Sequence, residues 1–141
     1  MKTVSLLLVE DDDIDAEALE RALVAQRIGN PLHRACDGEE ALEMLRGEGD
    51  HSPKLAHPVI VLLDLNMPRM NGFEFLKELR NDPKLSHTVV FVLTTSDDQR
   101  DRLAAYEAHV SGYIVKNHNA GAGFVEVAKL LESFWRVVEF P

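Results

Sequence analysis

Five short segments rich in Val, Leu and Ile recur along the chain, and each is followed by a stretch with a helical spacing of apolar residues. In most of these segments the apolar residues run on without polar alternation. Such continuous runs are typical of parallel strands that are covered on both faces. The sequence therefore predicts strands over residues 4–9, 32–36, 59–63, 88–94 and 112–115, of which 32–36 has the weakest pattern.

The stretches between the strands predict helices, because their apolar residues recur at the spacing that lines one helix face. Alternating strands and helices imply right-handed crossovers and an α/β sandwich of three layers. We expect one domain over residues 1–141, with a C-terminal helical extension at about 134–141 and no effector domain. The predicted helices cover residues 14–27, 39–46, 72–80, 98–108 and, from about 121 or 123, the chain up to about 138. The apolar face of the first helix would comprise Ile14, Ala18, Leu19, Ala22 and Leu23, and that of the fourth Leu103, Ala104 and Ala108.

The composition argues for a soluble, folded chain and against several classes of partner. Hydrophobic residues make up 45% of the chain, and the formal net charge is −9. Nucleic acids and anionic membranes attract basic surfaces, so this charge argues against both. The single cysteine, Cys36, excludes an internal disulfide and suits a reducing compartment. No signal peptide is recognisable, and no stretch approaches about 20 apolar residues, the length that a membrane helix needs. We therefore expect a cytoplasmic protein.

Chemically reactive side chains gather just after the predicted strands. In open parallel sheets, ligands bind beyond the carboxyl ends of the strands. Asp12 and Asp13 are most simply explained as helix caps. The other carboxylates would repel one another unless a cation neutralised them, and oxygen ligands of this kind suit Mg²⁺. The residues at these strand ends are Glu10, Asp11, Asp64, Thr94, Thr95, Ser96 and Lys116.

Asp64 stands out among them, because a carboxylate at the end of the fully apolar strand 59–63 needs compensation. Beside Mg²⁺ it could attack a phosphorus atom and become an aspartyl phosphate. Thr94 and Lys116 would then contact the phosphoryl oxygens. The turn that follows offers three further candidates, which are the backbone carbonyl of Asn66 as a metal ligand and the loop-shaping residues Pro68 and Gly72.

Five pieces of the sequence resemble the receiver domains of two-component response regulators. They occur in family order and span nearly the whole chain: LLLVEDD, DGEEAL, VLLDLNMPRMNG, VFVLTTS and SGYIVK. The resemblance implies a flavodoxin-like, doubly wound fold with a five-stranded parallel sheet of order 2-1-3-4-5. It also implies a switch that accepts a phosphoryl group from a sensor histidine kinase in the presence of Mg²⁺, for which Mn²⁺ can substitute.

The resemblance assigns roles in the metal site residue by residue. Asp64 corresponds to the phosphoacceptor, and Asp11 to the main carboxylate ligand of Mg²⁺. The backbone carbonyl of Asn66 corresponds to the third protein ligand. Glu10 is the partner of Asp11 in the acid pair, at a position where many members have Asp. Its extra methylene still allows a water-mediated contact with the metal.

Further roles concern the phosphoryl group and the switch. Thr94, with Thr95 beside it, corresponds to the hydroxyl that binds the phosphoryl group, and Lys116 to the lysine. Tyr113 matches the switch aromatic, which turns inward as Thr94 moves toward the phosphoryl group. Asn117 stands where most members have proline, often after a cis peptide bond. A cis bond without proline costs about 3–4 kcal/mol, which favours trans between Lys116 and Asn117, but the sequence leaves both isomers open.

A finer resemblance is to the single-domain regulators that partner bacterial and cyanobacterial phytochromes. It rests on the long loop 47–58, on LTTS after the fourth strand and on the C-terminal ESFWRVVEFP. It implies that the kinase is of the phytochrome type.

The last helix carries more apolar residues than one buried face needs. A first stripe, which includes Trp135, can pack on the sheet, and a second set is left over. Because exposed apolar patches mark interfaces, we expect a homodimer through the helix 98–108, the strand 112–115 and the last helix. The alternative is that the tail folds back over the core. The candidate dimer residues are Leu130, Phe134, Trp135, Val137 and Phe140.

Two other functions fit the sequence less well than the phosphoacceptor switch. A phosphohydrolase with an aspartyl-phosphate intermediate typically needs a second carboxylate two residues after the nucleophile. That position is Asn66, so we expect no enzyme activity beyond self-phosphorylation and self-dephosphorylation. A degenerate receiver that only binds proteins usually lacks the acceptor, an acid or the lysine, and all of these are present. A phosphorelay intermediate or a phosphate sink remains open.

Overall fold

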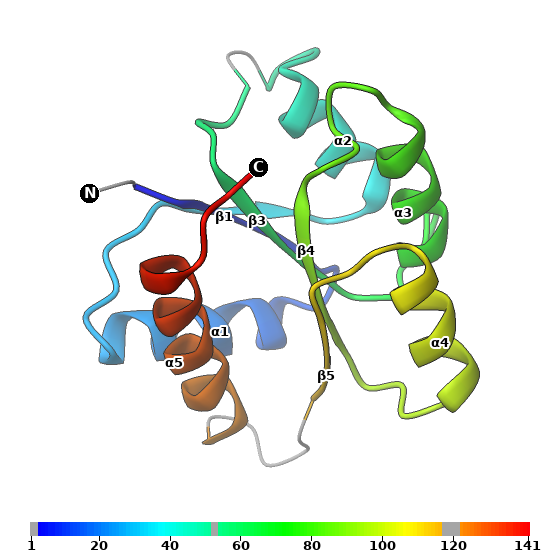
Figure 1. The fold of residues 1–141 in the computed structure, drawn as a ribbon. Helices are drawn as coiled ribbons and strands as arrows, with labels where there is room; N and C mark the ends of the chain where they lie inside the picture. The colour runs from blue at the N-terminus through cyan, green and yellow to red at the C-terminus, as the bar shows by residue number, and fades with distance from the viewer. Residues whose placement is uncertain (1–2, 52–53, 117–121) are drawn as a thin grey trace.

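The computed structural model describes residues 3–51, 54–116 and 122–141, and strands and helices alternate along them (Figure 1). The strands are β1 (Ser5–Val9), β2 (Leu32–Ala35), β3 (Val59–Leu63), β4 (Val89–Thr94) and β5 (Gly112–Val115). The helices are α1 (Asp13–Ala25), α2 (Gly38–Arg46), α3 (Gly72–Asn81), α4 (Gln99–Glu107) and α5 (Ala122–Val137). Every predicted strand and helix is present, and the observed ends differ from the predicted ends by two residues at most. No described helix has the length and apolar character needed to cross a membrane.

The strands form one parallel sheet in the order β2-β1-β3-β4-β5, which is the order that the family resemblance implies. At the carboxyl ends of the three central strands, Val9 lies beside Leu63 and Leu63 beside Val92. The residues that follow these strands therefore emerge at one edge of the sheet. The predicted flavodoxin-like α/β fold is confirmed.

Helices cover both faces of the sheet, with α1 and α5 on one face and α2, α3 and α4 on the other (Figure 1). Successive residues of a strand point to opposite faces. In β3, Ile60 and Leu62 pack with α1 and α5, whereas Val61 and Leu63 pack with the other three helices. All of β3 is buried, which explains its uninterrupted apolar sequence.

Short polar residues begin four of the helices. Asp12, Asp37, Asn71 and Asp98 accept hydrogen bonds from backbone N–H groups in the first turns of α1, α2, α3 and α4. Of the two candidate caps of α1, Asp12 is the cap and Asp13 is the first helical residue. Each cap satisfies N–H groups that would otherwise lack a partner at the helix start.

Parts of two predicted helix faces are wrong. Ile14 is 73% exposed and Leu103 is 55% exposed, although the sequence pattern predicts both to be buried, and Ala104 is exposed as well. Ala16 is buried in α1, together with the correctly predicted Leu19, Ala22 and Leu23, and Ala105 is the buried residue of α4. Ala16 and Ala105 each lie two positions after the misassigned Ile14 or Leu103, which corresponds to about 200° around a helix. Ile14 and Leu103 therefore lie on the solvent-facing sides of their helices.

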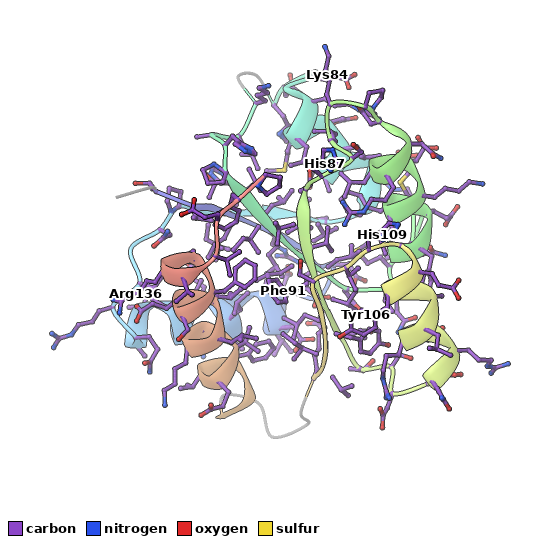
Figure 2. All side chains as sticks on the ribbon, viewed as in Figure 1. Lys84, His87, Phe91, Tyr106, His109 and Arg136 are labelled. Carbon is purple, nitrogen blue, oxygen red and sulfur yellow. The ribbon has the colours of Figure 1, made fainter. Side chains whose placement is uncertain are left out.

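The C-terminal tail folds back over the core, which corrects part of the expected exposed set. Phe134 packs edge-on against Phe91 with the ring centroids 5.0 Å apart, and Phe140 packs against Phe134 at 5.9 Å. Figure 2 shows Phe91 between β4 and α5. The predicted exposure of Phe134 and Phe140 is therefore wrong, because both rings complete this aromatic cluster. Leu130 and Val137 are exposed, by 44% and 81%.

Candidate functional site

Three carboxylates meet at the carboxyl edge of the sheet. Glu10 and Asp11 follow β1, Asp64 follows β3, and one oxygen of each lies within 4.8 Å of the other two. Glu10 and Asp64 are buried, whereas Asp11 is exposed. Like charges at this spacing repel one another, and a donor set made only of carboxylate oxygens is one that Mg²⁺ and Mn²⁺ accept. These residues therefore fit a divalent cation, with Asp11 on the solvent side.

Lys116 brings a positive charge to the same cluster. Its Nζ donates to the Glu10 carboxylate and, at 2.8 Å, to Oδ2 of Asp15, and it lies 3.6 Å from Oδ2 of Asp64. Its side chain is only 7% exposed, so these carboxylates replace water as its partners. Burial lowers the pKa of Lys116, but the hydrogen bonds to Asp15 and Glu10 outweigh it and raise that pKa above its ordinary value. Asn117, which follows, lies outside the described residues.

The pKa of Glu10 lies far above the ordinary value of a glutamate. Burial is the main cause that raises its pKa to about 8; its hydrogen bond with Lys116 opposes this, and the charge of Asp64 adds to it. A cation bound at the cluster would favour the charged form of Glu10. Metal binding and loss of the Glu10 proton are therefore linked.

Asp64 is fixed by contacts of its own backbone and side chain. Its N–H donates to the carbonyl of Val9 at 3.1 Å, and its Oδ1 accepts from the N–H of Asn66 at 3.2 Å. The loop after it closes through a hydrogen bond from Gly72 N–H to the Leu65 carbonyl. A Cβ on Gly72 would stand 2.7 Å from the carbonyl oxygen of Asp64. Only glycine fits here without displacing the Asp64 backbone.

Thr94 and Tyr113 both contact Ser96. Thr94 is fully buried, and its hydroxyl oxygen accepts from the Ser96 N–H at 3.3 Å. The Tyr113 hydroxyl donates to the Ser96 carbonyl at 2.9 Å, and the guanidinium carbon of Arg102 lies 5.9 Å from the centre of its ring. Burial is the main cause that raises the pKa of Tyr113. Thr95, between Thr94 and Ser96, is exposed.

The model of the response regulator receiver domain family matches residues 6–127, which include β1 from its second residue, β2 to β5 and the start of α5. The chain belongs to this family. Receiver domains are phosphoacceptors, and the acids, hydroxyl and lysine gathered here all lie inside the matched range.

Individual receiver proteins resemble the chain over nearly its whole length. The response regulator Rcp1 of Synechocystis sp. is 38% identical over 132 residues, which are 92% of this chain and 87% of Rcp1. The crystal structure of the phosphorylated cyanobacterial phytochrome response regulator RcpA superimposes with a TM-score of 0.86 at 35% identity, over 97% of both chains. That of the Mn²⁺-bound form of Rcp1 gives 0.85 at 35% identity, over 97% of this chain and 98% of its own. The resemblance to phytochrome response regulators is thus confirmed.

Two residues of the receiver site escaped the sequence analysis. Asp15 shares Lys116 with Glu10. Arg34 of β2 donates from Nε to the backbone carbonyl of Glu10 at 3.0 Å and from Nη1 to Asp13 at 2.6 Å. The acids between Glu10 and Asp15 were the only sequence signal for these contacts. Their order did not show which of them would pair with Lys116 or Arg34.

Another unexpected contact lies on the loop after Asp64. Arg69 follows Pro68, which is exposed, and its guanidinium pairs with the buried carboxylate of Asp37. Asp37 begins the piece DGEEAL, so the resemblance marked this residue but gave it no partner.

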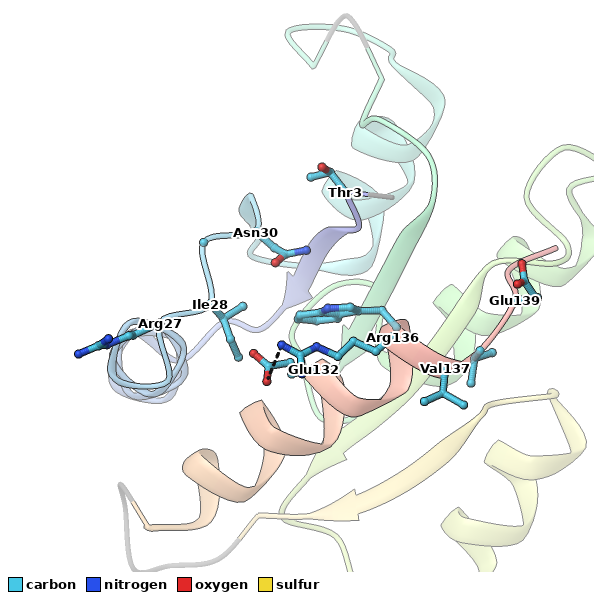
Figure 3. Close-up of a pocket in the computed structure, with 11 residues that line it drawn as sticks. Thr3, Arg27, Ile28, Asn30, Glu132, Arg136, Val137 and Glu139 are labelled. Carbon is cyan, nitrogen blue, oxygen red and sulfur yellow. Dashed lines mark ion pairs between the residues drawn. The ribbon is translucent and has the colours of Figure 1, made fainter. Parts of the chain in front are cut away.

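A groove of about 570 Å³ lies away from the receiver site, between the turn 27–30 and the end of α5 (Figure 3). Trp135 lines it, and Arg136 beside it pairs with Glu132 at 3.5 Å. Trp135 was a candidate dimer residue, and it is half-buried against the turn that follows α1. Among the described residues, the only group of acids, histidines or cysteines spaced to hold a metal ion is the one at Asp64.

Proposed function

We propose that residues 1–141 form one receiver unit that accepts a phosphoryl group on Asp64 from a sensor histidine kinase, with Mg²⁺ or Mn²⁺ as cofactor. One observation carries the proposal. The buried Asp64 carboxylate stands beside two further carboxylates and 3.6 Å from a buried ammonium group. A nucleophile, a place for a cation and a positive charge for phosphoryl oxygens therefore lie together.

Asp64 is the nucleophile in this proposal. One of its oxygens bonds to phosphorus while the bond from phosphorus to the donor histidine nitrogen breaks, and the leaving imidazole keeps the electron pair and takes up a proton. Glu10, Asp11, Asp64 and the backbone carbonyl of Asn66 would hold the divalent cation, which would supply positive charge to the phosphoryl oxygens. Lys116 adds a fixed charge at the same place. Attack of water on phosphorus later releases phosphate and restores the carboxylate.

Thr94 and Tyr113 carry the change to the surface. The Thr94 hydroxyl leaves the Ser96 N–H and binds a phosphoryl oxygen, with Thr95 on the exposed side of the same loop. Movement of Ser96 then releases the Tyr113 hydroxyl, whose partner is the Ser96 carbonyl. Because both contacts share Ser96, the two side chains move together.

The kinase in this proposal is of the phytochrome type. Support comes from the structural likeness to RcpA, which is described as a phytochrome response regulator. The aromatic tail, on which the sequence resemblance also rests, packs on this fold through Phe134 and Phe140.

The acceptor is tested by the intact mass of the protein after incubation with phosphoramidate and Mg²⁺. We expect the wild type to gain one phosphoryl group, and the gain to disappear with EDTA or in Asp64→Asn. Asp97→Asn is the matched control, since it removes the same charge at an exposed residue near the site and should leave labelling unchanged. An adduct that persists in Asp64→Asn would contradict the assignment of the acceptor. No adduct in the wild type at any Mg²⁺ concentration would favour a receiver that binds its partners without phosphorylation.

We also propose a homodimer through α4, β5 and α5. Support comes from large apolar side chains that these elements expose. Tyr106 lies on the side of α4 toward β5 (Figure 2). Exposed apolar groups on neighbouring elements favour an interface. The residues concerned are Leu103, Tyr106, Val115, Leu130 and Val137.

Sedimentation at tens of micromolar tests the dimer. We expect the wild type to sediment as a dimer and Leu103→Glu as a monomer, because a buried unpaired carboxylate in the interface is costly. Val24→Glu is the control, since Val24 is also an exposed apolar residue, at 70%, but lies on α1. A monomeric wild type, both phosphorylated and unphosphorylated, would rule the dimer out.

A further inference from the structure

An ion pair ties the loop after the acceptor to the amino end of α2. Arg69 donates to Oδ2 of Asp37 through both Nε, at 3.1 Å, and Nη2. The other oxygen of Asp37 accepts from the Glu40 N–H at 2.9 Å and caps α2. Both oxygens of this carboxylate therefore have a partner of their own.

The burial of Asp37 makes loss of this ion pair costly. Arg69 is largely exposed, and exposed ion pairs contribute little by themselves. Asp37, however, is only 3% exposed, so loss of Arg69 leaves a buried oxygen without one of its donors. Burial raises the pKa of Asp37, but the hydrogen bonds from Glu40 N–H and Arg69 outweigh it and hold that pKa below its ordinary value.

The backbone of Arg69 adds a second indication that the loop is held in place. Its φ is 62°, in the left-handed region that residues with a Cβ seldom occupy. The neighbouring Met70 carbonyl accepts from the Gly38 N–H at 3.4 Å, and the Met70 side chain lies so close to Gly38 that a Cβ there would be 2.8 Å from its Cγ. Residues 69–70 therefore rest directly on the start of α2.

We propose that Asp37 and Arg69 form a clamp that positions the loop from Asp64 to Asn66 for binding of the divalent cation. This inference rests on the proposed cation site. Asn66 lies three residues before Arg69, and its N–H already binds the Asp64 carboxylate. The clamp fixes one end of this loop, and the close contact at Gly72 fixes the other. Arg69 touches neither the cation nor the phosphoryl group, so it is a positioning residue.

Binding of Mn²⁺ tests the clamp without any phosphoryl transfer. We would measure free Mn²⁺ by electron paramagnetic resonance during titration of the wild type, Arg69→Asn and Arg69→Lys. Asparagine tolerates the left-handed backbone, so Arg69→Asn removes the guanidinium and leaves the conformational preference in place. We expect the Mn²⁺ dissociation constant of Arg69→Asn to rise about tenfold, as is usual when a partner behind metal ligands is lost. Arg69→Lys should lie between the two.

Arg100→Asn is the matched control. Arg100 is exposed and also pairs with a carboxylate, Asp98, through Nε and Nη2, but it lies on α4. The Arg100→Asn protein should bind Mn²⁺ with the same dissociation constant as the wild type. The rate of labelling by phosphoramidate provides a second readout, because a positioning role predicts that saturating Mg²⁺ restores most of the rate of Arg69→Asn.

Equal Mn²⁺ affinity of the wild type and Arg69→Asn would overturn the clamp, whether or not Asp64 is phosphorylated. So would an equal loss in Arg100→Asn. Thermal unfolding in EDTA shows whether Arg69→Asn is folded at the assay temperature, and if it is not, Arg69→Lys decides by the same criterion. Weakened Mn²⁺ binding together with an unphosphorylated wild type would support the clamp and overturn only the phosphoacceptor function.

Discussion

Replacement of Lys116 by methionine is expected to lower the free energy of unfolding by about 3–5 kcal/mol at pH 9, the usual cost of leaving buried charges without their partner. The Lys116 ammonium is the shared cation of Glu10 and Asp15 and lies near Asp64. Methionine has a flexible side chain that fills much of the same space, so the loss is mainly electrostatic. Urea unfolding in EDTA, followed by circular dichroism, measures the difference.

The difference should grow with pH. In the folded protein the pKa of Glu10 is raised from 4.5 to about 8, so Glu10 holds its proton more tightly than in the unfolded chain. This contribution to stability is complete below about pH 4.5 and is lost as the pH rises through about 8. Above that pH the wild-type Glu10 is charged and paired with Lys116, whereas the variant offers it no such partner. We therefore expect a larger deficit at pH 9 than at pH 6.

Lys129→Met is the control for the loss of one lysine charge. Lys129 is more than half exposed and lies 3.8 Å from Glu126, so its replacement should change the free energy of unfolding by no more than about 0.5 kcal/mol. Addition of Mg²⁺ should restore part of the stability of Lys116→Met, because a cation at the three carboxylates relieves the same repulsion. A loss in Lys116→Met no larger than in Lys129→Met would show that the buried ion cluster does not stabilise the fold.

The sequence was sufficient for the sheet because burial on both faces leaves a local signature. The segment 59–63 is apolar at every position, and β3 occupies the same residues. Parallel strands end at the same edge of a sheet, and this places Glu10, Asp11, Asp64 and Lys116 together. The prediction of this cluster therefore needs the strands but not the helices. Chemistry at strand ends is therefore accessible to sequence reasoning whenever the strands themselves are clear.

Contacts between loops were not accessible in the same way. The pair of Asp37 and Arg69 joins residues that are 32 positions apart, and nothing in either local sequence selects the other. The tail shows a related limit. Helical periodicity placed Phe134 off the buried stripe, but it could not show that Phe91 and Phe140 would enclose its ring. Such contacts depend on where segments cross in space, which a repeat along the chain does not encode.

Replacement of Gly72 by alanine is expected to lower the free energy of unfolding by about 2–3 kcal/mol, as overpacking of a close contact does. The new Cβ would stand 2.7 Å from both the carbonyl oxygen of Asp64 and the Cα of Leu65. Neither is the end of a flexible side chain, so the backbone that carries the acceptor must move. A small displacement of a nucleophile is costly, and labelling by phosphoramidate should slow by about tenfold or more.

Gly29→Ala separates this steric effect from the general effect of removing a glycine. A Cβ on Gly29 meets nothing within 4 Å, so this variant should be as stable as the wild type or slightly more stable, because alanine restricts the unfolded chain. Both variants alter the unfolded chain alike, and only Gly72→Ala pushes on Asp64. A Gly72→Ala protein with a lowered free energy of unfolding could still accept the phosphoryl group at the wild-type rate. That result would show that Asp64 keeps its position when its close contact with residue 72 is disturbed. Loss of both properties together would mean that the close approach of Gly72 holds Asp64 where the chemistry needs it.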